Sequence, residues 1–353
     1  MVIPHRGGHP RSGVRHAARP GQRPPGRSPA WPQQSDDHPM NAARLAVGVD
    51  IGGTKIAFAL VSREGDVLAE NRLPTLPEEG APAVLDRIAA GIRDLLAQAG
   101  RPVDGIGIGC PGYVNPHTGI CHRAVNLDWT DVPLRDDLLR RLALDLPVAV
   151  HRDTNAGAVG EWMFGAGRGQ SDFVYAAIGT GMGFGAVTGG RLLLGRGFQA
   201  MEFGHVSFDP HGRLCRCGLR GCVEAYVSGV GLLAGYHEHR ADFPASPLAL
   251  MANVTVGDIL FAAGRGDALA LCLLDEASDR LAAALACCVG MTDPGLFIIG
   301  GGLGLALYDR LMPGLEKRVR ARTLPVTHGH LRFARSQVTS SAAGAAALVW
   351  MNA

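Results

Sequence analysis

Residues 45–55 read LAVGVDIGGTK, a β-rich run that stops at two glycines and places an acid, Asp50, at its end. A second β-rich run over 55–61 follows at once, and a third begins at Val67 after the turn at 64–66. Apolar and β-branched residues bounded by turn residues predict strands. The segment therefore predicts a β-meander with a tight Gly/Thr turn between its first two strands.

The same pattern returns in the second half of the chain. Strands are expected at 173–178 and 184–188, on either side of the Gly/Thr turn 179–181. Other strands are expected at 103–108, 148–150 and 296–299, and helices at 83–99, 134–144, 155–163, 223–236, 256–262, 268–289 and near Leu307. Two similar α/β lobes that face each other across a cleft are the simplest architecture that uses both turns.

Bulk composition narrows the class of partner. A chain of 353 residues with 47% apolar content can bury two cores, and a net charge of +2 gives no field strong enough to attract nucleic acid or an anionic membrane. No run is long and apolar enough to span a bilayer, and the start lacks the apolar region of a secretory signal. We expect a cytoplasmic protein with a small-molecule partner.

The expected domain organisation has three parts. Residues 1–40 are rich in Arg and Pro and poor in aliphatic residues, which predicts a disordered extension, either dispensable or upstream of the true start, with a basic arm that touches nucleic acid as the alternative. Residues 41–156 form the N-terminal α/β lobe, and a C-terminal helix at about 340–353 packs back on it. Residues 157–339 form the C-terminal α/β lobe, which carries a zinc-binding insertion at 200–224.

Four metal ligands gather in that insertion. His205, Cys215, Cys217 and Cys222 are soft or borderline ligands, and the glycines among them give the backbone the freedom to bring them together. Together they would fill a tetrahedral shell and leave no position for a catalytic water, which predicts structural Zn²⁺. The alternative is a set of free thiols in a reducing cytosol.

Both Gly/Thr turns are candidates for holding phosphate. Backbone N–H groups of such turns bind phosphate oxygens, and Asp50 can bind Mg²⁺ through water. No GxxxxGK[ST] run is present, and the second turn lies between strands rather than at a helix start, unlike a dinucleotide fold. The candidates are Asp50, Gly52, Gly53, Thr54 and Lys55 in the first turn and Gly179, Thr180, Gly181 and Gly183 in the second. An ordinary hairpin turn is the alternative for each.

Asp153 is the candidate catalytic group. It follows the strand 148–150 and precedes a helix, where a carboxylate can take a proton from a sugar hydroxyl as that oxygen attacks a γ-phosphate. The alternative is a helix N-cap. Glu202 and Glu224 flank the metal ligands and suit binding of vicinal hydroxyls, with solvated loop acids as the alternative. The second ring nitrogen of His205 also needs a partner, and a sugar hydroxyl fits.

These motifs together resemble the ROK family of bacterial sugar kinases and repressors, which have an actin-like (ribonuclease H-like) two-lobed α/β fold. The sequence DIGGTK at 50–55, EFGH at 202–205 and CRCGLRGCVE at 215–224 carry the resemblance. It covers nearly everything from Ala43 to the C-terminus.

The resemblance implies a role for each site residue. Asp153 would be the general base that deprotonates the 6-hydroxyl, and Gly300 and Gly301 would lie near the adenosine of ATP. The sugar would be held by Gly112, Asn126, Asp153, Glu202, His205 and Glu224. The implied cofactors are ATP, Mg²⁺ and structural Zn²⁺, and the implied assembly is a homodimer or homotetramer.

The predicted function is ATP-dependent phosphorylation of a hexose at O6. Glucose is the first choice because 126–129 followed by 132–134 resembles the glucokinases of the family; N-acetylglucosamine, N-acetylmannosamine, mannose, fructose and polyphosphate as donor stay open. Many family members have Asn before the catalytic Asp, whereas this chain has Arg152. A non-catalytic sugar-sensing regulator is the alternative, although 1–40 lacks the period of the winged helix-turn-helix that family repressors carry.

Overall fold

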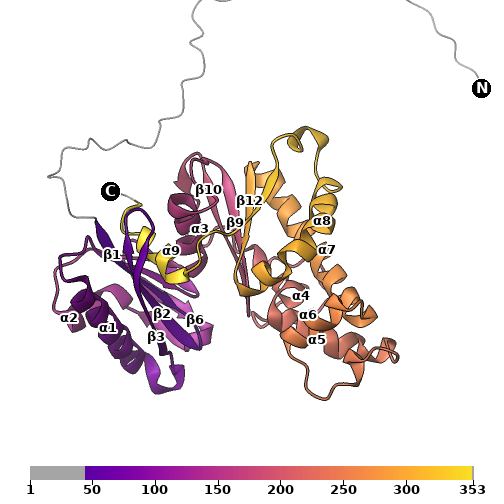
Figure 1. Ribbon diagram of the computed structural model, residues 1–353, viewed down its shortest axis with the longest axis horizontal. Coiled ribbons are helices and arrows are strands. Elements are labelled where there is room, and N and C mark those ends of the chain that lie inside the picture. The colour runs from indigo at the N-terminus through magenta and orange to yellow at the C-terminus, as the bar shows by residue number, and fades with distance from the viewer. Residues whose placement is uncertain (1–43, 352–353) are drawn as a thin grey trace, which may run out of the picture. The chain divides into compact units, whose positions relative to one another are not determined.

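Two five-stranded sheets with equivalent strand orders organise the part of the chain that the structure describes. Figure 1 shows the neighbouring strands β1, β2 and β3 of one sheet and β9, β10 and β12 of the other. The computed structural model describes residues 44–351, so the predicted extension at 1–40 lies outside the described residues. The first sheet has the order β3-β2-β1-β4-β8 and the second β11-β10-β9-β12-β13. In each, three antiparallel strands are followed by two parallel ones. The predicted two-lobed α/β fold with a repeated strand pattern is confirmed.

The strand bounds follow the sequence pattern closely. The first sheet contains β1 (Leu45–Ile51), β2 (Lys55–Ser62), β3 (Val67–Pro74), β4 (Ile106–Cys110) and β8 (Val148–Arg152). The second contains β9 (Phe173–Ile178), β10 (Met182–Thr188), β11 (Arg191–Leu192), β12 (Leu296–Gly300) and β13 (Arg332–Arg335). The strand expected at 103–108 begins later, at Ile106, because residues 102–105 are irregular and bend at Asp104 before the strand pairing starts.

Helices pack on both sheets and on one another. They are α1 (Gly80–Ala99), α2 (Leu134–Leu142), α3 (Asp153–Phe164), α4 (Glu224–Val227), α5 (Gly229–His239), α6 (Val256–Gly264), α7 (Ala268–Thr292), α8 (Gly302–Arg320) and α9 (Ser341–Ala347). The apolar stripe of α1, which includes Val84, Ile88 and Ile92, is buried against the first sheet, as its helical spacing predicts. Among the described residues, no helix combines the length and apolar character needed to cross a bilayer.

Helices α3 and α9 pack on each other and tie the two sheets together. Helix α9 lies on β1 and β2 of the first sheet, whereas α3 lies on β9 and β10 of the second. Glycines allow these close contacts: a Cβ on Gly160 would lie 2.6 Å from Gly344 Cα, and one on Gly48 would lie 1.8 Å from the carbonyl oxygen of Ala342. Helix α3 follows the first sheet in sequence but supports the second, and α9 follows the second sheet but covers the first.

A buried carboxylate fixes the segment that leads into α9. Glu161 of α3 is 1% exposed, and its Oε1 accepts hydrogen bonds from the Ser336 hydroxyl (2.6 Å) and from the N–H groups of Gln337 (3.0 Å) and Val338 (2.9 Å). Its Oε2 accepts from Ala166 N–H at 2.8 Å. A buried acid is tolerated only with such partners, so Glu161 pins the connection between β13 and α9 to α3.

Two features differ from the sequence prediction. A three-stranded sheet of β5 (Tyr113–Asn115), β6 (Ile120–Ala124) and β7 (Trp129–Val132) was not predicted, because its strands are short and mix polar with apolar residues. The helix expected over 223–236 is broken at Ser228, whose extended backbone separates α4 from α5 and whose hydroxyl caps α5 through Gly231 N–H (3.1 Å).

We expect Gly48→Ala to lower the free energy of unfolding by about 1–3 kcal/mol, because the added methyl group would overlap the Ala342 carbonyl. Gly290→Ala is the matched control: it is exposed in α7 with no atom near the new methyl, and helix propensity predicts a gain of about 0.5–1 kcal/mol. Urea unfolding measures both. Equal midpoints for the two variants would contradict the packing of α9 on β1.

Candidate functional site

Strand register brings the two predicted carboxylates together. Asp50 of β1 pairs with Gly109 of β4, Gly109 pairs with His151 of β8, and Asp153 follows β8 directly as the first residue of α3. A Cβ on Gly109 would lie 3.4 Å from Asp153 Cα and 3.5 Å from Asp50 Oδ1. The carboxyl ends of three parallel strands thus place Asp50 and Asp153 around one glycine.

The surroundings of Asp153 raise the pKa of its carboxyl group above the ordinary value. Part of its side chain is exposed, but protein surrounds it on most sides, and this desolvation, helped by the negative charge of Asp50, raises the pKa of Asp153 to about 6. The Thr154 N–H donates to Asp153 Oδ1 at 2.7 Å and, with Arg152, opposes the increase. Burial also raises the pKa of Asp50, opposed by the Ser341 hydroxyl and Lys55.

The first Gly/Thr turn is braced from β3. Gly52 N–H donates to the Lys55 carbonyl at 2.9 Å, which closes the hairpin turn. Fully buried Thr75 donates its hydroxyl to Gly52 O (2.7 Å) and its N–H to Thr54 O (3.0 Å). Sequence reasoning missed Thr75, since nothing in its local pattern signals a contact across 23 positions.

The second Gly/Thr turn rests on the start of α3. A Cβ on Gly183 would lie 2.5 Å from Thr154 Cγ2, so this glycine lets β10 approach the residue after Asp153. The turn is held from the other side by α4 and α5: Met182 N–H donates to Glu224 Oε2 at 2.9 Å, and Gly229 N–H donates to Gly179 O at 2.9 Å. The second turn therefore lies beside Asp153 and Glu224.

Two more predicted regions adjoin these turns. A Cβ on Gly53 would lie 3.3 Å from Asn126 Cβ, which places the predicted sugar residue Asn126 against the first turn. Gly300 pairs with Ala177 of β9, and Gly301 has a positive φ of 77° at the start of α8. Strand β12, which ends at Gly300, is thus the neighbour of β9, which leads into the second turn. The positive end of the α8 dipole at Gly301 favours anions at this place.

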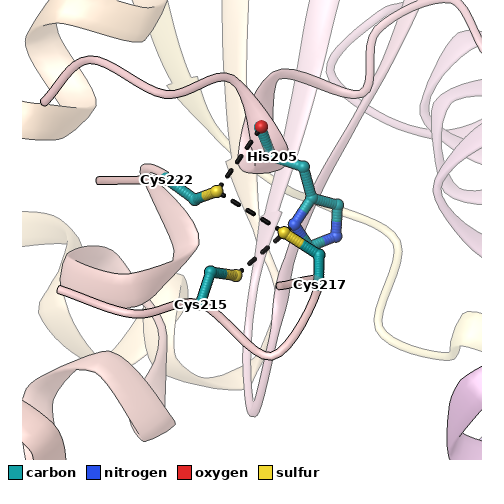
Figure 2. A group of neighbouring side chains, drawn as sticks. All are labelled: His205, Cys215, Cys217 and Cys222. Carbon is teal, nitrogen blue, oxygen red and sulfur yellow. Dashed lines mark hydrogen bonds between the residues drawn. The ribbon is translucent and has the colours of Figure 1, made fainter. Parts of the chain in front are cut away.

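The predicted zinc ligands converge, as Figure 2 shows. The ligand atoms of His205, Cys215, Cys217 and Cys222 all lie within 4.8 Å of one another. Cys217 Sγ and Cys222 Sγ are 3.6 Å apart, and Cys215 Sγ is 3.7 Å from His205 Nδ1. Tetrahedral zinc with Zn–S of about 2.3 Å and Zn–N of about 2.0 Å requires an S–S separation of about 3.8 Å and an S–N separation of about 3.5 Å. Two of the separations therefore match the edges of a tetrahedral zinc site, and all four ligand atoms lie within 4.8 Å of one another.

The local backbone explains how this cluster forms. Bridges between Ser207 and Cys222 and between Leu214 and Arg220 fold the insertion back on itself. Burial and the neighbouring thiols raise the pKa of Cys222, and burial raises that of Cys215. Thiols with raised pKa values are protonated at neutral pH, so a metal ion that binds here would have to displace these protons.

Glu202 and Gly112 show contacts that the sequence could not reveal. Glu202 forms an ion pair with Arg152, the residue that departs from the family pattern. Gly112 has a φ of +88°, and a Cβ there would lie 2.1 Å from the Arg123 carbonyl oxygen, so the turn into β5 by itself demands glycine.

A separate cavity of about 610 Å³ lies between α7 and α8. Leu271, Asp275, Arg310 and Arg318 are among the residues that line it, and none of the predicted site residues does. The converging strand ends, and not this cavity, bring the candidate catalytic groups together.

The fold and this arrangement define a two-lobed α/β protein of the actin-like class, with glycine turns on both sides of a carboxylate. The model of the ROK family matches residues 46–351, and the chain belongs to the ROK family.

Curated relatives include sugar kinases of two kinds. The chain is 38% identical over 271 residues to the glucokinase of Streptomyces coelicolor, a match that covers 73% of this chain and 82% of that protein. It is 32% identical over 262 residues to the N-acetylmannosamine kinase of Escherichia coli O157:H7, covering 74% of this chain and 84% of that protein.

Solved structures include both branches of the family. A ROK family glucokinase from Streptomyces griseus in complex with glucose and AMPPNP has a TM-score of 0.72 and 34% identity, and covers 87% of this chain and 98% of that one. A ROK family transcriptional regulator, a homologue of the E. coli MLC protein, has a TM-score of 0.78 and 28% identity, covering 88% and 78% respectively.

We expect Thr75→Val to lower the free energy of unfolding by about 1–3 kcal/mol, because it leaves the partly buried Gly52 carbonyl with one fewer donor. Thr188→Val, at an exposed position of β10, is the matched control and should change it by less than about 0.5 kcal/mol. Thermal unfolding compares the two. Equal stabilities would remove Thr75 from its bracing role.

Proposed function

We propose that this chain is an ATP-dependent kinase that transfers the γ-phosphoryl group of ATP to the 6-hydroxyl of glucose. The observation that carries the proposal is the position of Asp153, which stands at the ends of three parallel strands with a glycine turn from each sheet beside it. The identity with glucokinases supports the same reaction and the same sugar.

In the proposed reaction Asp153 accepts the proton of the 6-hydroxyl as the sugar oxygen bonds to the γ-phosphorus. The bond between that phosphorus and the bridging oxygen breaks, and ADP leaves with the electron pair. Backbone N–H groups of the two turns hold phosphate oxygens. Mg²⁺, with Asp50 as its protein partner through water, would neutralise the charge on the phosphates. Gly300 and Gly301 would border the adenosine.

The sugar-binding set combines residues from both lobes. The proposed ligands are Gly112, Asn126, Asp153, Glu202, His205 and Glu224. Nδ1 of His205 is the nitrogen next to Cys215, which leaves Nε2 for a sugar hydroxyl. Glu224 accepts from Met182 N–H with Oε2, so it couples the sugar side of the site to the second phosphate turn.

We infer that His205, Cys215, Cys217 and Cys222 hold one structural Zn²⁺. The interatomic distances support this assignment, and four protein ligands leave no position for a reacting water. The metal would act as a staple that fixes the insertion 200–224, from which Glu202, His205 and Glu224 reach the sugar.

The proposal has alternatives for the sugar and for the class of protein, and it extends to the assembly, the location and the lobe boundary. N-acetylmannosamine, N-acetylglucosamine, mannose and fructose are alternative acceptors, and the first is favoured by the 32% identity with an N-acetylmannosamine kinase. A non-catalytic sugar-sensing regulator is the second class, favoured by the likeness to a ROK family regulator. A homodimer or homotetramer, a cytoplasmic location and a lobe boundary at 156/157 remain predictions.

A coupled assay of ADP release across these sugars tests the proposal. We expect ATP- and Mg²⁺-dependent turnover with the highest kcat/KM on glucose. Turnover that is fastest on an N-acetylhexosamine would replace the sugar assignment, and sugar binding without any turnover would favour the regulator.

We expect Asp153→Asn to lower kcat by about 10²- to 10⁴-fold, because the amide cannot accept the proton. In the parent enzyme, kcat/KM for glucose should fall about tenfold per pH unit below about pH 6, since Asp153 works as the ionised base and is lost as pH drops through its pKa of about 6. Steady-state kinetics from pH 5 to 8 measure both effects. A profile that stays level to pH 5 would contradict this role.

We expect Cys217→Ser to lower the zinc content measured by mass spectrometry and to raise the KM for glucose more than the KM for ATP, because the insertion carries sugar ligands. Cys287→Ser is the control, since Cys287 is exposed in α7 and distant in sequence from the cluster. Stoichiometric zinc in both variants, or its absence from the parent protein purified without chelator, would refute the zinc site.

A further inference from the structure

Arg152 is a buried cation that ends β8. Its side chain is 4% exposed, and its guanidinium donates to the carbonyl oxygens of Ala200 (2.8 Å) and Phe184 (3.3 Å) and to the carboxylate of Glu202. Nε is buried without a partner among the described residues. A buried guanidinium is costly unless anions compensate it, and two carboxylates do so here: Glu202 through the ion pair and the neighbouring Asp153 through its charge.

The backbone of the segment that carries Glu202 is held in a fixed conformation next to Arg152. Met201, the residue before it, is buried with a left-handed φ of 70°, a conformation that costs about 1 kcal/mol or more for a residue other than glycine. Gly204, two residues after it, packs so closely on β10 that a Cβ would lie 2.6 Å from Met182 O. The backbone on both sides of Glu202 is therefore constrained.

The ion pair joins two parts of the site that are 50 positions apart in sequence. Arg152 immediately precedes Asp153, and Glu202 lies three residues before His205. The Glu202 side chain is 31% exposed, whereas that of Arg152 is enclosed. Glu202 Oε1 faces Arg152, which leaves the other carboxylate oxygen to contact a ligand.

We propose that Arg152 is a positioning residue that fixes Glu202, so that Glu202 presents a single acceptor oxygen to one hydroxyl of a neutral hexose. The pair cancels its own charge, and the second oxygen can accept a hydrogen bond from one hydroxyl rather than chelate a vicinal pair. Arg152 thereby makes sugar affinity depend on that hydroxyl. The inference rests on the proposed function for its ligand.

Calorimetric titration with glucose, without ATP, tests the inference separately from turnover. The variants are Arg152→Met, Arg152→Lys, Glu202→Gln and the double variant Arg152→Met/Glu202→Gln. Arg318→Met, which breaks ion pairs with Asp275 and Asp279 on α7, is the matched control. Zinc content, Tm and the KM values for ATP and glucose are measured for each protein.

We expect Arg152→Met to raise the Kd and KM for glucose at least about tenfold and to leave the KM for ATP and the zinc content within about twofold. Arg152→Lys keeps the positive charge but replaces the planar guanidinium, with its several N–H donors, by one ammonium group. It should therefore bind glucose more tightly than Arg152→Met and more weakly than the parent. The double variant should bind glucose no more weakly than the weaker single variant, because both changes remove one coupled contact. The control should bind as the parent does.

Three results would overturn the inference: a glucose Kd for Arg152→Met within twofold of the parent, additive effects in the double variant, or an equal rise in the KM for ATP. If Arg152→Met does not fold, Arg152→Lys and Glu202→Gln carry the same comparison. A parent protein that binds glucose without turnover would refute the proposed function while the Kd values still decide the inference. A parent that binds no hexose would refute both.

Discussion

The parallel pairing of β1 with β4 and of β4 with β8 is the constraint on which the site depends. This register sets Asp50, Gly109 and His151 side by side, and it leaves Asp153 as the first residue beyond the sheet. A slip of one residue would turn every side chain of a strand to the other face. The buried core residues of these strands, such as Val49 and Ile108, prevent that slip because they cannot be exposed without a large loss of hydrophobic free energy.

The second lobe brings its own part of the site to the same place. Helix α3 begins at Asp153, directly after the last strand of the first sheet, and packs on β9 and β10 of the second. Glu224 then links the second turn to the cysteine cluster, since it accepts from Met182 N–H and lies 3.8 Å from Cys215 Sγ. The start of α3, the second Gly/Thr turn and the cluster of His205 and the three cysteines therefore form one connected network of contacts.

Much of this could be predicted from the sequence, and the failures have physical causes. Strands such as 45–51 and 173–178 are continuous apolar runs bounded by turns, and the cysteine spacing is specific, so the fold and the convergence of the metal ligands were predictable. The β5–β7 sheet was not, because its strands are short and polar. The partners of Arg152, Thr75 and Glu161 are long-range contacts, and a single sequence contains no signal of spatial proximity for them.

The most direct test of the central claim is the identity of the product formed from glucose and ATP, measured by correlating its ³¹P and ¹H NMR signals. A single phosphate ester whose phosphorus couples to both protons on C6 is the predicted result. It would mean that the 6-hydroxyl is the acceptor of the phosphoryl group. A phosphate on the anomeric carbon, or ADP release with only inorganic phosphate as the product, would contradict the assignment of this chain as a hexose 6-kinase.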